Sequence, residues 1–410
     1  MKTDFFTMND LQSPSAEASK KVSKKKPRLG RYDRIKRELE ENDDDPNKIF
    51  VDISSSKPPS ARFSFVDLFS GAGGISCGLD AAGYEPKVSV EMVEIASATH
   101  KRNFPACKHF CGDIHEFRAT EWLSEEEQRT TNLVIGGPPC QGFSVAGKRD
   151  PNDPRNQLFL EFIRVVAELK PWYVVIENVP GILTMQGGAV RHAIVEALKG
   201  VGYENVSVAV LESAAYGVAQ VRPRAIFIAN RFGLPNPFPK PLLQKDEYAP
   251  IESVISDLPA WDPLPEVNHE WTKHSQKFME RIAEVPAGGS LYPTFYDAFK
   301  RQYPGVPSMT IKENHGGTHI HPSLNRCISA REMARLQSFP DSFIFEGKMK
   351  KAMWQIGNAV PPRLAECIGY ALAPMLEHIA HGTPLPEAFK ANTSGNLSLF
   401  STGHPKAPST

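Results

Sequence analysis

One cysteine lies in a loop whose composition suits a reactive thiol. Cys140 follows an apolar run at 133–135 and sits within the loop GGPPCQGFS, residues 136–144. A strand that ends in such a loop presents its side chains at the carboxyl edge of a sheet, where open α/β folds build their sites. Cysteine is the strongest ordinary nucleophile near neutral pH, so the loop favours covalent catalysis. The alternative is a small buried cysteine at a tight turn.

Other groups capable of chemistry also stand at the ends of apolar stretches. The glycine-rich turn at 71–74, Glu91 and Glu177 each follow such a stretch. In a parallel sheet these ends converge with Cys140 on one crevice. A glycine-rich first turn lets the backbone approach a ligand and leaves helix N–H groups free. Glu91 suits a ribose diol, and Asp113, where a third strand would end, suits an adenine amine. Together these groups predict a nucleoside-type cofactor.

The elements that must position these groups alternate along the chain. The expected strands, including an antiparallel pair at the end, cover 63–69, 87–90, 133–135, 172–176, 206–211 and 225–229. The expected helices start at Ile75 and cover 158–169, and a later return to the same domain covers 331–338 and 355–370. Strands alternating with helices predict an α/β fold with a mostly parallel, doubly wound sheet.

Composition divides the chain into five segments. Residues 1–61 carry a basic and then an acidic run, and predict a disordered charged arm with a short helix at 31–41. The other expected segments are a first domain at 62–231, a smaller Pro-, Gly- and His-rich domain at 232–325, the return to the first domain at 326–382, and a disordered tail at 383–410.

Composition also limits the class of protein. The chain has 410 residues, of which 41% are apolar, enough for one large domain and a smaller one. It contains no apolar run of about 18 residues, so no membrane span is predicted. Six scattered cysteines favour reduced thiols. Cys107 and Cys111 lack a second pair, and the histidine-rich stretch 315–321 lacks cysteines, so no metal site is predicted.

The ordered motifs between residues 63 and 372 resemble those of cytosine-5 DNA methyltransferases of the bacterial and phage type. The six matching motifs are DLFSGAGG at 67–74, GGPPCQGFS at 136–144, ENV at 177–179, QVRPR at 220–224, REMARLQ with FP at 331–340, and QIGNAVPP at 355–362. The resemblance implies a Rossmann-like S-adenosylmethionine-dependent fold, with 232–325 as a small target recognition domain. It also implies that the closing motif packs beside the first one.

This resemblance implies a catalytic set of Cys140, Glu177, Arg222 and Arg224. The Cys140 thiolate attacks carbon 6 of cytosine, which makes carbon 5 nucleophilic. Glu177 protonates or hydrogen-bonds ring nitrogen 3, for which burial would favour its protonated form. Arg224 holds the cytosine carbonyl, and Arg222 supports the loop or a phosphate. The target base is flipped out of the duplex to reach them.

The resemblance also assigns binding residues. The residues expected to bind S-adenosylmethionine are Phe69, Ser70, Gly71, Gly73, Gly74, Glu91, Asp113, Ile114, Pro138, Asn358 and Ala359. For Phe69 a core aromatic is the alternative, and for Asn358 a brace between the domains. The residues expected to bind DNA are Gln141, Ser144, Lys148 and Arg149, on a loop that would close over the flipped base. An ordinary surface loop is the alternative there.

The expected partner is double-stranded DNA, with a cognate restriction endonuclease that need not touch this chain. A monomer without membrane contact is expected, in the bacterial cytoplasm near the nucleoid, or in the nucleus of a eukaryote. Three other functions are alternatives: a transfer-RNA methyltransferase of the related branch, a small-molecule or protein methyltransferase, and a non-enzymatic DNA-binding relative. The first carries a Cys-Phe-Thr segment that this chain lacks, and the last tends to lose the nucleophile or the acid.

Overall fold

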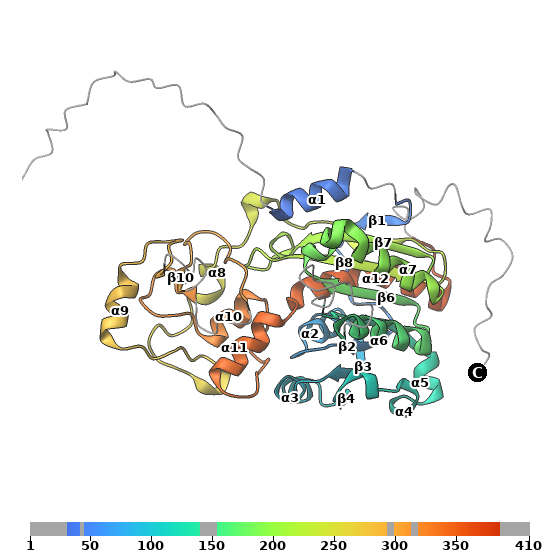
Figure 1. Ribbon diagram of the computed structural model, residues 1–410, viewed down its shortest axis with the longest axis horizontal. Helices are drawn as coiled ribbons and strands as arrows, with labels where there is room; N and C mark the ends of the chain where they lie inside the picture. Colours follow the sequence, from blue (N-terminus) through green and yellow to red (C-terminus); the bar gives the residue numbers. More distant parts are fainter. Residues whose placement is uncertain (1–30, 42–44, 140–153, 293–298, 313–318, 386–410) are drawn as a thin grey trace, which may run out of the picture.

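A computed structural model describes residues 31–41, 45–139, 154–292, 299–312 and 319–385. It has two lobes. One is built on a seven-stranded sheet, and the other contains the short helices α8 to α11 (Figure 1). The strands are β1 Lys48–Val51, β2 Ser64–Leu68, β3 Glu85–Glu91, β4 Lys108–Cys111, β5 Thr131–Gly136, β6 Tyr173–Asn178, β7 Asn205–Glu212, β8 Pro223–Asn230, β9 Asn236–Pro239, β10 Lys300–Arg301 and β11 His319–Ile320.

The large sheet has the order β4-β3-β2-β5-β6-β8-β7. Its first five strands are parallel, and β8 is antiparallel to both β6 and β7. The predicted mostly parallel α/β sheet with an antiparallel pair is therefore confirmed. The parallel order brings the carboxyl ends of β2, β3, β5 and β6 to one edge, as the sequence required.

The α-helices of the described residues belong to both lobes. They are α1 Arg31–Glu41, α2 Gly74–Ala81, α3 Glu94–Asn103, α4 Ala119–Trp122, α5 Glu125–Arg129, α6 Pro154–Leu169, α7 Ala189–Gly200, α8 Glu252–Ile255, α9 Gln276–Ala283, α10 Ala330–Leu336, α11 Met349–Asn358 and α12 Pro362–His381. The expected return segment at 355–370 thus spans two helices. Pro361 is the N-cap of α12 and Pro362 its first residue. Proline cannot donate the backbone hydrogen bond that a continuous helix would need here.

Both faces of the sheet are covered, which explains why its central strands are largely apolar. On one face, Phe162 of α6 packs in the same core as Val66 of β2. On the other face, Leu79 of α2 and Leu372 of α12 pack in a core that contains Phe65. Because successive strand residues point to opposite faces, Asp67 lies on the second face with Phe65.

The N-terminal segment is more ordered than its composition predicts. The short helix expected at 31–41 is α1, and β1 pairs in parallel with β9. Ile49, Val51 and Ile53 are buried in the core between the sheet and α12. The prediction of a disordered arm does not hold for 48–53, because these alternating aliphatic residues fill that core. Residues 1–30 and 386–410 lie outside the described residues.

The domain boundaries predicted at residues 232 and 326 do not match the division of the chain into two packed lobes. β9 lies beyond residue 232 and yet belongs to the sheet lobe through its pairing with β1. Conversely, α10 and α11 lie beyond 326 and pack with α8 in the second lobe, through Met333, Ile356 and Ile255. The composition of the sequence shows where regular periodicity stops. It does not show which apolar faces pack against one another, and these contacts define the two lobes. Over the described part of the chain, no helix is long and apolar enough to cross a membrane.

Candidate active site

A cavity of about 700 Å³ lies where the strand ends of the sheet lobe meet the second lobe. It is lined by most of the predicted site residues, namely Phe69, Ser70, Gly71, Gly74, Glu91, Asp113, Ile114, Pro138, Glu177, Arg222, Arg224, Asn358 and Ala359. A larger cavity of about 930 Å³ lies between α1 and α7 and is lined by none of these residues. The convergence predicted for the strand ends is therefore found for the described part of the site.

The glycine turn after β2 has an unusual backbone. Phe69 has φ 58°, Gly71 φ 54° and Gly73 φ 98°, all in the left-handed region. Glycine adopts this region without steric cost, whereas Phe69 is strained there. A Cβ at Gly74 would lie 2.3 Å from the Val360 carbonyl oxygen, so glycine lets the closing motif pack against the first one.

Gly73 does not line the cavity, and its predicted contact with the cofactor is not supported. It precedes α2 as the N-cap residue, and a Cβ there would lie 2.8 Å from the His100 ring. Glycine is needed at this position for the left-handed backbone and for close packing on α3. The motif match alone did not separate this supporting glycine from those that face the ligand.

Glu91 at the end of β3 is fixed by backbone donors. Its Oε2 accepts a hydrogen bond from Gly71 N at 2.9 Å, and its Oε1 accepts one from Val93 N at 2.7 Å. Burial raises the pKa of this carboxyl. Each oxygen keeps a second lone pair, so the carboxylate can still accept two hydroxyl donors from a ligand. This geometry suits the diol predicted from sequence.

Two further polar groups complete the cradle. Asp113 Oδ1 accepts hydrogen bonds from His115 N and Nδ1 at 3.0 and 2.6 Å. The His115 backbone N–H, helped by its side chain, lowers the pKa of Asp113. Ser70 Oγ is buried and has no hydrogen-bond partner among the described residues. A buried hydroxyl without a partner is unfavourable unless a ligand supplies one. The cradle therefore fits a nucleoside-type cofactor.

The candidate acid is paired with an arginine. Glu177 lies on β6 and Arg224 on the neighbouring strand β8, and Arg224 Nε is 2.6 Å from Glu177 Oε1. Their side chains are only 13% and 10% exposed, so the two charges face each other in a largely dry part of the cavity. A guanidinium offers further N–H donors beyond this contact, which leaves Arg224 able to hold a ligand carbonyl.

The beginning of the cysteine loop is attached to this pair. Asn178 Nδ2 donates to the Pro138 carbonyl oxygen at 2.8 Å, and a Cβ at Gly137 would lie 3.0 Å from Glu177 Oε2. The loop thus leaves β5 directly beside Glu177. Cys140 itself lies outside the described residues, as do all four predicted DNA-binding residues, Gln141, Ser144, Lys148 and Arg149.

Arg222 has a different environment from Arg224. Its side chain is almost completely buried and donates to the carbonyl oxygens of Ile311 at 2.7 Å, Gly357 at 2.7 Å and Ala359 at 3.0 Å. Burial lowers its pKa well below the usual value. The prediction of a catalytic Arg222 is not supported, because its terminal nitrogens bind backbone on both sides of the cavity. These hydrogen bonds instead join the segment at Ile311 to the closing motif at 357–359.

The cavity also contains residues that the sequence did not single out. Trp354, Lys312, Thr310, Met92 and Leu158 line it together with the predicted set. Trp354 directly precedes the closing motif, and Met92 directly follows Glu91, so proximity to a motif was an available signal for these two. Thr310 and Lys312 come from a segment without regular periodicity, and only the fold brings them to the site.

Comparisons with known proteins agree with this geometry. Residues 63–373 match a family described as C-5 cytosine-specific DNA methylase. The chain is 38% identical over 327 residues to Type II methyltransferase M1.HphI of Haemophilus parahaemolyticus, covering 76% of this chain and 87% of that protein. It is 33% identical over 375 residues to Type II methyltransferase M.DdeI of Desulfomicrobium norvegicum, covering 77% and 90%. A solved structure described as a DNA modification methyltransferase encoded within an E. coli prophage is 28% identical, with a TM-score of 0.61, and covers 77% of this chain and 99% of that one.

Proposed function

Because this chain belongs to the C-5 cytosine-specific DNA methylase family, we propose that Cys140, Glu177 and Arg224 carry out its reaction. The enzyme transfers a methyl group from S-adenosylmethionine to carbon 5 of cytosine in DNA. The observation that carries the assignment of residues is the 2.6 Å Arg224–Glu177 pair beside the start of the cysteine loop. This pair opens into the same cavity as the glycine turn.

The chemistry assigns one role to each of these three residues. Carbon 5 of cytosine is a poor nucleophile until the Cys140 thiolate adds to carbon 6 and breaks the aromatic system. Glu177, in its protonated form, donates a proton or a hydrogen bond to ring nitrogen 3, and this nitrogen takes up the electron density that the addition delivers. Arg224 donates to the carbonyl oxygen at carbon 2. Once carbon 5 has been methylated, loss of its proton to a base such as water expels the Cys140 thiolate and restores the ring.

The cofactor cradle orients the second reactant. S-adenosylmethionine supplies an electrophilic methyl group on its sulfonium when it is bound. Glu91 accepts the ribose hydroxyls, Asp113 accepts from the adenine amine, and the Ser70 hydroxyl gains the partner that it lacks among the described residues. The residues proposed to line the remaining surface are Phe69, Gly71, Gly74, Ile114, Pro138, Asn358 and Ala359.

DNA reaches the cavity from the side where the two lobes meet. Enzymes that act on a base take it out of the stack, so the cytosine enters as a flipped base. The phosphate contacts are assigned to Gln141, Ser144, Lys148 and Arg149. The second lobe, around the segment 232–325, is assigned to reading base edges in the major groove. Its described part carries an exposed aromatic side chain in Trp261 and another in Tyr303.

The relatives also suggest a biological setting. M1.HphI and M.DdeI are named as Type II methyltransferases. We infer that this chain likewise modifies the sites of a restriction endonuclease, which recognises the same DNA and need not contact the methyltransferase. The enzyme acts as a monomer, because one chain supplies the acid, the arginine and the cofactor cradle. Its substrate confines it to the compartment that holds DNA, the bacterial cytoplasm near the nucleoid or a nucleus.

The assignment is tested by tritium transfer from labelled S-adenosylmethionine to duplex DNA with mixed sites. Wild type is compared with Cys140→Ala, and Cys111→Ser serves as the matched control because Cys111 is an exposed thiol on β4. Incorporation that requires Cys140 and is unchanged in Cys111→Ser is expected, and bisulfite sequencing then identifies the target site. A Cys140→Ala protein that still methylates DNA contradicts the assignment. Methyl transfer to RNA alone would mean that the substrate is RNA and not DNA.

The covalent step has its own readout. In a duplex with 5-fluorocytosine at the target site, fluorine cannot leave carbon 5 as a proton does, so the Cys140 adduct should persist after denaturation. Wild type and Cys111→Ser should form this adduct, whereas Cys140→Ala should not. Absence of an adduct from a wild-type protein that methylates ordinary DNA would exclude the covalent route.

A further inference from the structure

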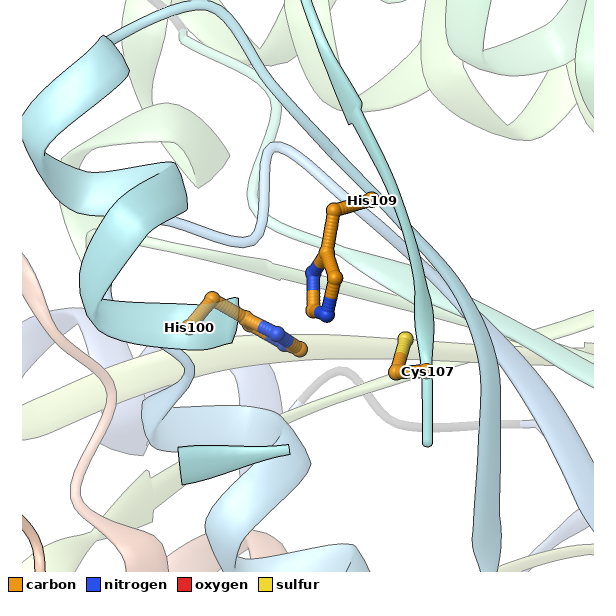
Figure 2. A group of neighbouring side chains, drawn as sticks. All are labelled: His100, Cys107 and His109. Carbon is orange, nitrogen blue, oxygen red and sulfur yellow. The ribbon is translucent and has the colours of Figure 1, made fainter. Parts of the chain in front are cut away.

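A cluster of three potential metal ligands lies outside the cofactor cavity. His100 on α3, Cys107 on the turn that follows it and His109 on β4 each offer one ligand atom, and these atoms all lie within 4.8 Å of one another. Figure 2 shows the three side chains gathered in one space between the helix and the strand. None of them lines the cavity that holds the proposed catalytic groups.

The three side chains of this cluster are largely withdrawn from solvent. His100 is completely buried and Cys107 is 5% exposed, while His109 is half-buried. The rings of His100 and His109 meet edge-on, with their centroids 5.0 Å apart. Imidazole nitrogen and thiolate sulfur are the ligands that Zn²⁺ prefers in proteins. Two histidines and a cysteine therefore form a suitable donor set.

The hydrogen bonds of His100 leave one nitrogen available. Ser76 Oγ lies 2.7 Å from Asp67 Oδ2 and 3.0 Å from His100 Nε2. When Ser76 donates its single proton to Asp67, it must accept from Nε2–H, which places the lone pair of neutral His100 on Nδ1. This Nδ1 is buried and has no hydrogen-bond partner in the described ranges. Asp67 thus fixes the tautomer of His100 through Ser76, whereas a carboxylate near bound zinc usually contacts the histidine directly.

Hydrogen bonds also fix the tautomer of His109. Its Nε2 lies 3.0 Å from the Phe104 carbonyl oxygen, which can only accept, so Nε2 carries the proton and Nδ1 the lone pair. Ser89 Oγ lies 2.8 Å from this Nδ1, and its hydroxyl must turn away for a metal to bind there. Cys107 Sγ makes a weak 3.3 Å hydrogen bond to the Lys108 carbonyl and loses its proton on metal binding.

We propose that His100, Cys107 and His109 bind one Zn²⁺ ion that joins α3 to β4. The three side chains supply three of the four positions of a tetrahedral site. The role is structural, because the ion lies away from the reacting groups and fixes the ring on which Gly73 packs. A metal at this place therefore stabilises the glycine turn of the cofactor cradle through the His100 ring, on the side of the turn away from the cavity.

Metal content of the full-length protein tests the proposal independently of catalysis. Protein purified from zinc-supplemented cells and passed over a chelating resin should contain one zinc per chain. His100→Ala and Cys107→Ser should each lose most of it, whereas Cys111→Ser should keep it, because Cys111 is exposed on β4 and outside the cluster.

Cobalt gives a spectroscopic signature of the site. Titration of metal-free wild-type protein with Co²⁺ should saturate at one equivalent, with a thiolate-to-cobalt charge-transfer band that Zn²⁺ abolishes on displacement. Chelation should also lower the thermal denaturation midpoint of wild type and leave that of Cys107→Ser unchanged. Folded wild-type protein that binds S-adenosylmethionine but takes up no stoichiometric zinc or cobalt would overturn the proposal. Equal loss of metal in Cys111→Ser would overturn it as well.

Discussion

The Arg224 guanidinium lies 2.6 Å from the Glu177 carboxylate, across the antiparallel pairing of β8 with β6. The strand register fixes this contact, because Asn178 pairs with Ala225, immediately next to both residues. The two groups are thus in place before a base arrives. Preorganised charges in a water-poor site contribute more to catalysis than mobile charges in solvent.

Replacing Arg224 by alanine should lower the rate of methyl transfer about 100-fold or more, as removal of a preorganised donor does in other enzymes. Both the cytosine carbonyl and Glu177 lose a partner. Arg224→Lys should recover only part of the rate, because an ammonium cannot serve both groups in the geometry of a guanidinium. Single-turnover transfer at saturating DNA and cofactor measures the effect.

A double-mutant cycle with Glu177→Gln then tests whether the pair acts as a unit. Glu177→Gln alone should slow transfer about 100- to 10,000-fold, the range for a lost general acid. The double variant should be little slower than the worse single variant, because each substitution already disables the pair. Losses that multiply would mean that the two residues act separately, against the arrangement seen here.

Much of the site could be predicted because parallel strand ends must converge. The glycine turn, Glu91 and Glu177 follow recognisable strands, so their meeting at one edge needed only the fold class. The role of Arg222 could not be read in the same way. Its partners Ile311 and Gly357 lie 89 and 135 residues away, and no local pattern indicates which carbonyl groups a buried guanidinium will reach.

The same holds for the fold: the parts that depend on neighbouring residues could be predicted, and the parts that depend on contacts between distant residues could not. Runs of apolar residues identified the central strands, because those strands are buried on both faces. β1 and β9 have four residues each, too few for a reliable period, and their order depends on pairing across 188 residues at Lys48 and Asn236. The lobe boundaries were missed for a related reason, since α10 and α11 have apolar faces that either lobe could have covered.

Arg222→Ala should reduce stability more than Arg224→Ala does. It leaves the carbonyls of Ile311, Gly357 and Ala359 without their donor and opens a cavity between the lobes. A loss of about 2–4 kcal/mol is expected for buried groups left unpaired. Thermal and urea denaturation of the two variants provide the comparison. An Arg222→Ala protein with wild-type stability but no turnover would instead place Arg222 in the chemistry.

The N-terminal strand should contribute to stability through one face. Ile49→Ala with Val51→Ala removes two side chains from the core beside α12, and a destabilisation of about 3–6 kcal/mol is expected from transfer and cavity effects together. Phe50→Ala is the matched control, because Phe50 lies between them and is 40% exposed. The denaturation midpoint should fall by several degrees in the double variant and little in the control. Equal effects would mean that β1 is not anchored by its buried face.

Cofactor affinity should depend on pH through Glu91. Burial raises the pKa of this carboxyl, and its ionised form accepts ligand hydroxyls more fully than its protonated form. Affinity for S-adenosylmethionine should therefore increase as pH rises through a midpoint above the usual glutamate range. The sign follows from linkage: a ligand that prefers the ionised carboxylate lowers its pKa, so binding near the midpoint releases a proton to the buffer. Calorimetric titrations in two buffers of different ionisation enthalpy count that proton.

Two variants separate Glu91 from other titrating groups. Glu91→Gln should bind the cofactor about tenfold more weakly at neutral pH, equivalent to about 1.4 kcal/mol, and its affinity should lose the pH dependence. Asp113→Asn should keep that dependence, because the His115 N–H holds the pKa of Asp113 below its usual range and leaves it ionised throughout. A wild-type affinity that stays constant across this pH interval would show that Glu91 binds no cofactor hydroxyl, since a buried carboxylate that accepts these hydrogen bonds must sense its own proton.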